Sequence, residues 1–442
     1  MNIILTLPVR ALSAKISNGE LSAEQVTRAH IEQIESCEPL VKAWQFFDAD
    51  LALRSARSLD QNSRSFDSPL RGIPVAVKDL MDTSDMPTTY GSPIYAGHRP
   101  TFDAACVGAC RDAGMVLLGK TVTTEFATLE PGVTLNPRAS AESPRTPGGS
   151  SSGSAAAVAA NMTPLALGTQ TAGSIVRPAA YCGVVGYKPT HGTLALAGVK
   201  PLSPSLDTVG AFARSVDDVA FFLGTLTRVN LKPQRLSSLR VGICRTVHWD
   251  RASEDARRAL EHARCQFEKT GARVHEIILP ASFEGLTQAQ IQIMSYEAAA
   301  AFEPERQMAG EKFSPAFTEL LAFGRSLNGA DIAASHLLAI AARQSLETIF
   351  KSVDVIVAPS AEGEAPEGLE ATGNPIFNRF WTLLGNPCVH VPTGTGAQGM
   401  PVGVTVIGPR WADALTLSAA HTLELSLDLG ATLINADSYT SS

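Results

Sequence analysis

Apolar residues along the chain alternate between helical spacing and short continuous runs typical of buried strands. Each change of pattern separates one expected element from the next. Residues 9–60 carry apolar side chains at helical spacing, with a capping box that begins at Ser22. Two short runs rich in Ile, Val and Leu, at 71–80 and 115–119, predict buried strands, and residues 104–113 between them predict a helix. This alternation of helix and strand favours an α/β fold.

The second half of the chain continues the alternation with a larger share of helix. Residues 214–350 are mostly helical in pattern, and strands are expected within them at 239–244 and 273–279. Because strands recur near the end and no repeat or clear linker interrupts the chain, we expect one interwoven domain over residues 1–442. The other expected elements are strands at 165–168, 182–189, 353–359, 388–392 and 401–408, and a last helix near 411–429.

Composition and charge narrow the class of protein. Hydrophobic residues make up 45% of the chain and charged residues 18%, so the chain can bury a large core. The net charge of −7 and the lack of a basic stripe give direct nucleic-acid binding little electrostatic support. No run approaches the ~18 apolar residues that a membrane span needs, and the first residues do not resemble a secretory signal. We therefore expect a cytoplasmic protein.

The seven cysteines also favour a cytoplasmic location. They are scattered along the chain, and none forms a C-x-x-C pair. Cys106 and Cys110 could share a helix face, but a single pair at this spacing is a weak zinc signal. We expect reduced, mostly buried thiols and no metal.

Two turns rich in glycine and serine carry the strongest chemical signal. The first runs from Thr146 to Ser154 and the second from Gln170 to Ser174. Helix-forming residues follow the first turn at once, which argues against a linker, and no Gly-Lys-Ser/Thr ending supports a phosphate loop. Such turns can aim backbone N–H groups at an oxyanion, but a serine nucleophile also needs a base, for which Lys78 is the candidate. On the turn alone, a catalytic role and a structural one remain equally open.

Longer motifs surround these turns and extend along most of the chain. They are Arg71-Gly-Ile-Pro-Val-Ala-Val-Lys78-Asp, Gly119-Lys-Thr-Val-Thr-Thr-Glu-Phe-Ala, Gly148-Gly-Ser-Ser-Ser-Gly-Ser-Ala-Ala-Ala-Val-Ala-Ala, Ala166-Leu-Gly-Thr-Gln-Thr-Ala-Gly-Ser174, Arg177-Pro-Ala-Ala-Tyr-Cys-Gly-Val-Val-Gly-Tyr-Lys-Pro-Thr, Ser205-Leu-Asp-Thr-Val-Gly and Met400-Pro-Val-Gly-Val. In this order they resemble the amidase signature family, and motifs of this length rarely match by chance.

The resemblance implies a fold, a catalytic triad and an oxyanion hole. The fold is one large mixed β-sheet sandwiched by helices, and no metal or cofactor is needed. Ser174 matches the nucleophile, Ser150 the bridging serine that follows a cis peptide bond, and Lys78 the base. Burial in an apolar strand lowers the pKa of a lysine, as a base near neutral pH requires. The oxyanion hole implied by the family consists of the backbone N–H groups of Thr171, Ala172, Gly173 and Ser174.

Other serines and histidines near the motifs have simpler interpretations. Ser151, Ser152 and Ser154 are expected to form hydrogen bonds within the loop or to cap the following helix rather than to act as catalysts. His98, His191 and His390 would suit a Ser-His mechanism only with a positioned acidic partner, and the sequence shows none. We leave the three histidines out of the site.

Departures from the family pattern point to the substrate. The second turn carries Gln170 and Ala172 where the usual motif has Asp and Gly. Arg177 lies three residues after Ser174 rather than two, an arrangement similar to malonamidase, in which the matching arginine binds a substrate carboxylate. We expect Arg177 to hold a carboxylate through two parallel hydrogen bonds, and a structural salt bridge is the alternative. Ser151 and Gln170 are further candidates for substrate binding. Positional candidates for the same pocket are Asn378, Arg379 and Trp381.

These observations lead to one main hypothesis and two rivals. The chain is expected to hydrolyse the C–N bond of small linear amides through an acyl-enzyme, with malonamate-like compounds or carboxylated urea derivatives favoured. Its only expected partners are this substrate and, by family, a second copy in a homodimer. The first rival is the A subunit of a glutamine-dependent tRNA amidotransferase, which needs a partner subunit, and the departures in the second turn and at Arg177 count against it. The second rival is a non-catalytic scaffold, which would have no chemical need for a complete triad.

Overall fold

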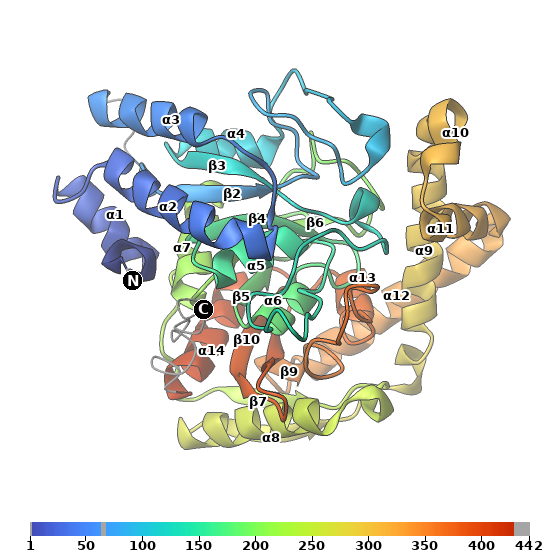
Figure 1. The fold of residues 1–442 in the computed structure, drawn as a ribbon. Coiled ribbons are helices and arrows are strands. Elements are labelled where there is room, and N and C mark those ends of the chain that lie inside the picture. The colour runs from blue at the N-terminus through green and yellow to red at the C-terminus, as the bar shows by residue number, and fades with distance from the viewer. Residues whose placement is uncertain (1, 63–67, 428–442) are drawn as a thin grey trace.

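A single β-sheet organises the computed structural model, which describes residues 2–62 and 68–427 (Figure 1). The strands of these residues are β1 (Trp44–Phe47), β2 (Pro74–Lys78), β3 (Val116–Thr121), β4 (Leu165–Gln170), β5 (Val185–Lys188), β6 (Thr208–Ala213), β7 (Arg240–Cys244), β8 (Arg273–Ile277), β9 (Val355–Pro359), β10 (Cys388–Thr395) and β11 (Pro401–Ile407). They join one sheet in the order β1-β3-β2-β4-β6-β5-β10-β11-β9-β7-β8. The sheet is mixed, because β2 pairs in parallel with β3 and β4 whereas β6 pairs antiparallel with β4 and β5.

Helices cover both faces of this sheet. They are α1 (Val9–Ser17), α2 (Ala23–Val41), α3 (Ala49–Gln61), α4 (Ala105–Asp112), α5 (Ser152–Ala159), α6 (Val176–Cys182), α7 (Val216–Thr227), α8 (Glu254–Lys269), α9 (Leu286–Ala301), α10 (Glu303–Ala309), α11 (Pro315–Ser326), α12 (Gly329–Ile349), α13 (Arg379–Leu384) and α14 (Asp413–Ser426). Helices α9 to α12 form a group beside the sheet, at the right of Figure 1.

The alternation of side chains along β2 separates two apolar clusters. Val75 and Val77 pack into the larger cluster with the apolar residues of α7. Ala76 points the other way, into a smaller cluster formed largely by the alanines of α5 and by residues of α2 and α3. Both faces of the central strands are therefore buried, which explains why these strands read as continuous apolar runs.

The expected large mixed sheet between helices is confirmed, with two strands added. The stretch 9–60 was expected to be helical throughout, but β1 interrupts it and pairs antiparallel with β3. Only four residues long, β1 is too short to change the period of its surroundings. Strand β6 was also missed, since Gly210 and two alanines weaken its strand signal.

Two further expectations concern the ends of the chain and membranes. The last helix, expected near 411–429, corresponds to α14, while residues 428 and 429 lie outside the described residues. None of the described helices combines the length and the apolar character that crossing a bilayer requires. A single domain over residues 1–442 stays a prediction.

Candidate active site

Lys78 is the last residue of β2 and is fully buried. Its Nζ atom donates hydrogen bonds to Ser150 Oγ at 2.8 Å and to Thr169 Oγ1 at 2.7 Å. Burial lowers the pKa of Lys78 well below the ordinary value of a lysine, and the negative charge of Asp207 partly opposes this shift. An amine that is neutral near pH 7 can accept a proton, so this position suits a general base.

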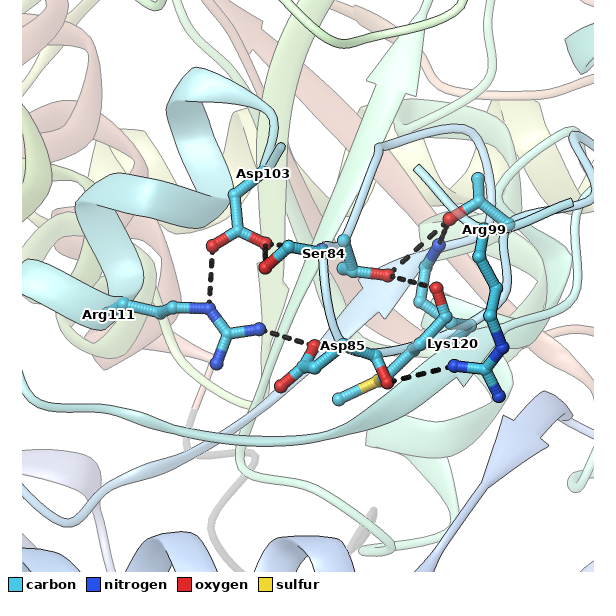
Figure 2. Close-up of polar contacts among 9 residues, drawn as sticks. Ser84, Asp85, Arg99, Asp103, Arg111 and Lys120 are labelled. Carbon is cyan, nitrogen blue, oxygen red and sulfur yellow. Dashed lines mark hydrogen bonds and ion pairs between the residues drawn. The ribbon is translucent and has the colours of Figure 1, made fainter. Parts of the chain in front are cut away.

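The loop after Lys78 is held in place by a charged network (Figure 2). Arg111 on α4 donates to Asp103 at 2.8 Å and to Asp85 at 2.5 Å. Asp103 also accepts hydrogen bonds from the backbone N–H and the hydroxyl of Ser84, at 2.8 and 3.1 Å. One guanidinium, in the last turn of α4, thus ties Asp85 and Asp103 near the two ends of the loop together and fixes the chain that leaves the lysine.

A second buried lysine lies next to the first and has a different environment. Lys120, on β3, forms an ion pair at 3.0 Å with Asp79, the neighbour of Lys78, and both side chains are completely buried. Lys78 has no ion pair with any acid of the described residues. Burial lowers the pKa of Lys120 as well, but the adjacent charge of Asp79 opposes that shift, whereas Lys78 has no such ion-pair partner among the described residues and its pKa is held well below the ordinary value.

Ser150 precedes α5 and follows a cis peptide bond to Gly149. Its side chain is fully buried. The helix that follows lies unusually close to neighbouring backbone: a Cβ atom on Gly153 would lie 2.3 Å from the carbonyl oxygen of Ala43 and 2.5 Å from the nitrogen of Val122. Only glycine allows this approach, which brings the start of α5, and with it Ser150, against the sheet.

Ser174 lies in the turn between β4 and α6, and 6% of its surface is exposed. Its hydroxyl forms no hydrogen bond with any residue of the described ranges. One turn later Arg177 donates a hydrogen bond of 2.7 Å to the carbonyl oxygen of Gly149. The two serine turns are thus joined, and the hydroxyl of Ser174 remains free to react.

The four N–H groups predicted as an oxyanion hole, at 171–174, have no acceptor within the described part of the chain. The carbonyl oxygens on the other side of this turn are engaged. Gln290 on α9 donates to the oxygen of Thr171 at 3.0 Å, and Thr382 on α13 donates to that of Ala172 at 2.7 Å. With its carbonyls held from behind, the turn presents its N–H groups to the pocket, as stabilisation of an oxyanion requires.

Asp207 supports the same turn from a buried position. It accepts hydrogen bonds from the hydroxyl of Thr171 and from the backbone N–H groups of Leu202 and Ser203, at 2.9 and 3.0 Å. Burial raises the pKa of Asp207 to about 6, and the hydrogen bonds from Thr171, Leu202 and Ser203 limit the rise. At neutral pH the carboxylate is therefore mostly charged and acts on the protonation of Lys78.

A pocket opens above Ser174, and two arginines line it together with this serine. Its cavity volume is about 30 Å³, and about 380 Å³ when the open space at its mouth is included. Arg177 donates to Thr372 Oγ1 at 3.1 Å, and its Nε is buried without a partner among the described residues. Arg379 donates to Gln290 Oε1 at 2.6 Å. The apolar part of the lining comes from Ala127, Leu129, Leu202, Met294, Leu320 and Pro375.

Both guanidinium groups lack a counter-ion. Neither Arg177 nor Arg379 forms an ion pair with an acid of residues 2–62 or 68–427. Burial lowers the pKa of each to about 10, and the charge of Arg177 contributes to the shift at Arg379. Both stay charged at neutral pH, so the pocket holds two uncompensated positive charges beside Ser174. An anionic group on the substrate would neutralise them.

The structure places Ser151 and Gln170 behind the pocket rather than in its lining. Ser151 is fully buried, and its hydroxyl donates to the carbonyl oxygen of Thr169 at 3.2 Å. The amide oxygen of Gln170 accepts from the N–H groups of Ile175 and Val176, at 2.8 and 3.0 Å. Both side chains are engaged within the protein, so their geometry supports holding the turns and gives substrate contact no support.

Of the three residues suggested by position alone, one lines the pocket and two lie behind it or in the core. Arg379 lines the pocket, whereas Trp381 is buried in the apolar core. Asn378 lies directly behind the turn, since a Cβ atom on Gly173 would lie 2.5 Å from its amide oxygen. Gly173 therefore cannot be replaced without displacing Asn378 or the turn itself.

Several residues of the site were not identified from sequence. Thr169 and Asp207 lie inside family motifs, at the end of β4 and before β6, and their places next to Lys78 and Thr171 could have been proposed from the motifs. Gln290 gives no signal in its weakly patterned helix. The histidines set aside earlier do not line the pocket of Ser174.

Comparison with known proteins identifies the family. The profile of the Amidase family matches residues 25–417. The chain belongs to the Amidase family. The A subunit of glutamyl-tRNA(Gln) amidotransferase from Oleidesulfovibrio alaskensis is 32% identical over 464 residues, covering 93% of this chain and 95% of that protein. Relatives of the same name in other bacteria are 30 to 33% identical.

Solved structures give the same assignment. Peptide amidase from Stenotrophomonas maltophilia has a TM-score of 0.78 and 28% identity, covering 95% of this chain and 96% of that chain. A structure described as a vestigial protein complex that reveals the origins of an s-triazine catabolic enzyme has a TM-score of 0.86 and 27% identity, covering 95% and 98%. This Amidase family member acts on amide C–N bonds, and the similarities do not single out malonamidase-like members.

Proposed function

We propose that this amidase hydrolyses linear amides whose acyl group carries a free carboxylate. The observation that carries the proposal is the pair of buried guanidinium groups, Arg177 and Arg379, which line the pocket of Ser174 without a counter-ion. A planar guanidinium binds a carboxylate through two parallel hydrogen bonds. A substrate such as malonamate, which has an amide and a carboxylate on one short acid, would compensate the charge and place its carbonyl carbon near the serine.

The proposed reaction begins with attack by Ser174 on the amide carbonyl. Ser150 takes the proton from Ser174 and passes its own to the neutral amine of Lys78, to which it is already hydrogen-bonded at 2.8 Å. The N–H groups of residues 171–174 receive the oxyanion. The same relay then returns a proton to the leaving nitrogen, so ammonia or an amine departs and an acyl-enzyme remains. Water attacks the acyl-enzyme by the same route and releases the acid.

The test compares matched substrates that differ in charge. Ammonia release is measured from malonamate and from its neutral analogue malonamide, with the wild type, Arg177→Gln and Arg379→Gln. We expect malonamate to be preferred, and each variant to lose about 1.5–3 kcal/mol of that preference, roughly 10- to 100-fold in kcat/KM. Hydrolysis of malonamide should fall less than that of malonamate, because Arg177 and Arg379 also hold the turns beside Ser174. A wild type that prefers malonamide, or variants that leave the preference intact, would overturn the proposed substrate class.

The curated relatives favour a second candidate, the A subunit of a glutamine-dependent tRNA amidotransferase. The observation is the 30 to 33% identity to proteins of that name along almost their whole length. Glutamine also carries an amide and a carboxylate, so the pocket suits it on the same physical grounds. In this case the chain would act with partner subunits and with tRNA, contrary to our expectation of no nucleic-acid partner.

An exchange experiment separates the two candidates. The chain replaces the corresponding polypeptide in the purified amidotransferase of Oleidesulfovibrio alaskensis, and formation of Gln-tRNA(Gln) is measured alongside hydrolysis of glutamine and malonamate by the isolated chain. Restored amidation supports the second candidate. Malonamate hydrolysis by the isolated chain without restored amidation supports the first.

A further inference from the structure

A second pocket lies away from the catalytic serines, where α12 meets the turn after α13. Its cavity volume is about 300 Å³, and about 680 Å³ when the open space at its mouth is included. It shares no lining residue with the pocket of Ser174. Apolar surface comes from Leu346, on α12, and from Phe350, which directly follows this helix. The charged side chains of the lining are three cations and one acid, namely Arg343, Lys351, Arg410 and Glu347.

The positive charges of this pocket are not paired. Within the described residues, none of Arg343, Lys351 and Arg410 forms an ion pair, and Glu347 forms none with them. Arg410 makes no hydrogen bond to a described residue either. Its charge lies close enough to Arg343 to add to the lowering of that residue's pKa by burial. Two guanidinium groups that repel each other in one hollow produce a field suited to an anion.

Further polar groups around the pocket add to the same picture. Lys188 is buried within reach of the charge of Arg410 and, among the described residues, donates only to the carbonyl oxygen of Pro189, at 2.8 Å. Asn386 lines the pocket, and its amide oxygen is buried without a hydrogen-bond donor among the described residues. The nearest buried acid, Asp413, is already occupied by hydrogen bonds from Tyr187 and Thr190. The pocket thus has two guanidinium groups that can bind an anion. It also has one acceptor, the amide oxygen of Asn386, for an O–H or N–H group of a ligand.

We propose that this pocket binds a small organic oxyanion with an apolar stem, either a carboxylate or a phosphate monoester. The charged group would lie between Arg343 and Arg410, which can each bind two oxygens in the plane of the guanidinium. The stem would pack on Leu346 and Phe350. This site is separate from the proposed substrate pocket and does not depend on the substrate class assigned there.

Helix α13 connects the two pockets. Its first residue, Arg379, lines the pocket of Ser174, and Thr382 donates to the carbonyl oxygen of Ala172 in the oxyanion turn. At its other end, the carbonyl oxygens of Leu383 and Leu384 accept hydrogen bonds from Arg343, at 2.6 and 3.2 Å. An anion that draws Arg343 away from these carbonyls weakens the support of the turn, so occupancy of the second pocket should lower kcat.

Calorimetric titration tests the site with benzoate, phenyl phosphate and the neutral benzamide. The variants are Arg410→Gln in the second pocket, Arg177→Gln in the pocket of Ser174, and Arg54→Gln on the exposed surface of α3 as a control. We expect benzoate or phenyl phosphate to bind at one site at least about tenfold more tightly than benzamide. Arg410→Gln should weaken this binding about tenfold, whereas Arg177→Gln and Arg54→Gln should retain it. In the absence of ligand, Arg410→Gln should hydrolyse amides at the wild-type rate.

Each outcome decides the proposal. Binding that Arg410→Gln weakens and Arg177→Gln retains confirms the second site, and the tighter of the two anions identifies the carboxylate or the phosphate class. Binding lost only in Arg177→Gln shows that the anion occupies the catalytic pocket and overturns the proposal. Equal binding of benzamide, or no anion binding at millimolar concentration, overturns it as well.

Discussion

Replacing Lys78 with methionine tests whether the lysine is neutral in the folded protein, as a base must be. In the unfolded chain the pKa of a lysine is 10.5, and burial holds the pKa of Lys78 well below this value in the fold. Between these two pKa values the unfolded state binds one proton more than the folded state. The free energy of unfolding therefore rises with pH in this window, by about 1.4 kcal/mol per pH unit.

For a lysine that is neutral in the fold throughout the pH interval, the magnitude follows from the interval alone. Lys78→Met removes the titrating group, so the free energy of unfolding of the wild type minus that of the variant should grow by about 2.7 kcal/mol between pH 7 and pH 9. Loss of the hydrogen bonds to Ser150 and Thr169 adds an offset of about 1–3 kcal/mol, which does not depend on pH. The slope and the offset can therefore be separated.

Urea unfolding at pH 7, 8 and 9 measures this difference. Lys15→Met is the control, because Lys15 is an exposed lysine whose partner, Glu20, is also exposed. Its difference from the wild type should show no comparable slope. If the difference for Lys78→Met is constant from pH 7 to pH 9, the lysine is charged in the folded protein. The assignment as base then fails, even if the variant is inactive.

Four other substitutions test the remainder of the site. Ser174→Ala should abolish amide hydrolysis and covalent labelling by a fluorophosphonate, and labelling of this variant would refute Ser174 as the nucleophile. Ser150→Ala should lower kcat by about 10³-fold or more and keep the thermal unfolding temperature near that of the wild type. Asp207→Asn removes a negative charge that raises the pKa of Lys78, so the acidic limb of kcat/KM should shift to lower pH, and a shift to higher pH would contradict the coupling. Thr382→Val removes the hydrogen bonds to Gln170 and to the oxyanion turn. It should lower the free energy of unfolding by about 1–3 kcal/mol and also lower kcat. If the free energy of unfolding and kcat are both unchanged, these hydrogen bonds are dispensable.

The triad could be proposed from sequence because its three members sit in dense local patterns. Lys78 ends an apolar strand, and the two serines lie in glycine-rich turns, so each signal spans only a short run of neighbouring residues. Such patterns constrain the backbone directly and survive without knowledge of the fold.

The pocket could not be derived in this way, because its parts come from distant segments. Gln290 on α9 joins Thr171 to Arg379, two residues that lie in opposite halves of the chain. Gln170 shows a different limit: its departure from the family motif suggested contact with substrate, and its amide oxygen accepts hydrogen bonds at the start of α6, which gives that prediction no support. A change in a motif can reflect a new neighbour such as Thr382 as well as a new ligand. The homodimer and the cytoplasmic location remain predictions.

The division of the site between two regions has a consequence for protein engineering. The groups proposed to carry out the chemistry, Lys78, Ser150 and Ser174, are anchored on neighbouring strands β2 and β4 and the turns beside them. Gln290 and Arg379, in contrast, belong to α9 and α13, which can be varied without touching the strands. Gln290 also holds the oxyanion turn, and Asn378 packs behind Gly173. A mutant library confined to the other positions of 286–301 and 375–379 should therefore redirect substrate choice and spare the reaction, and selection for a neutral amide would be expected to remove Arg379 first.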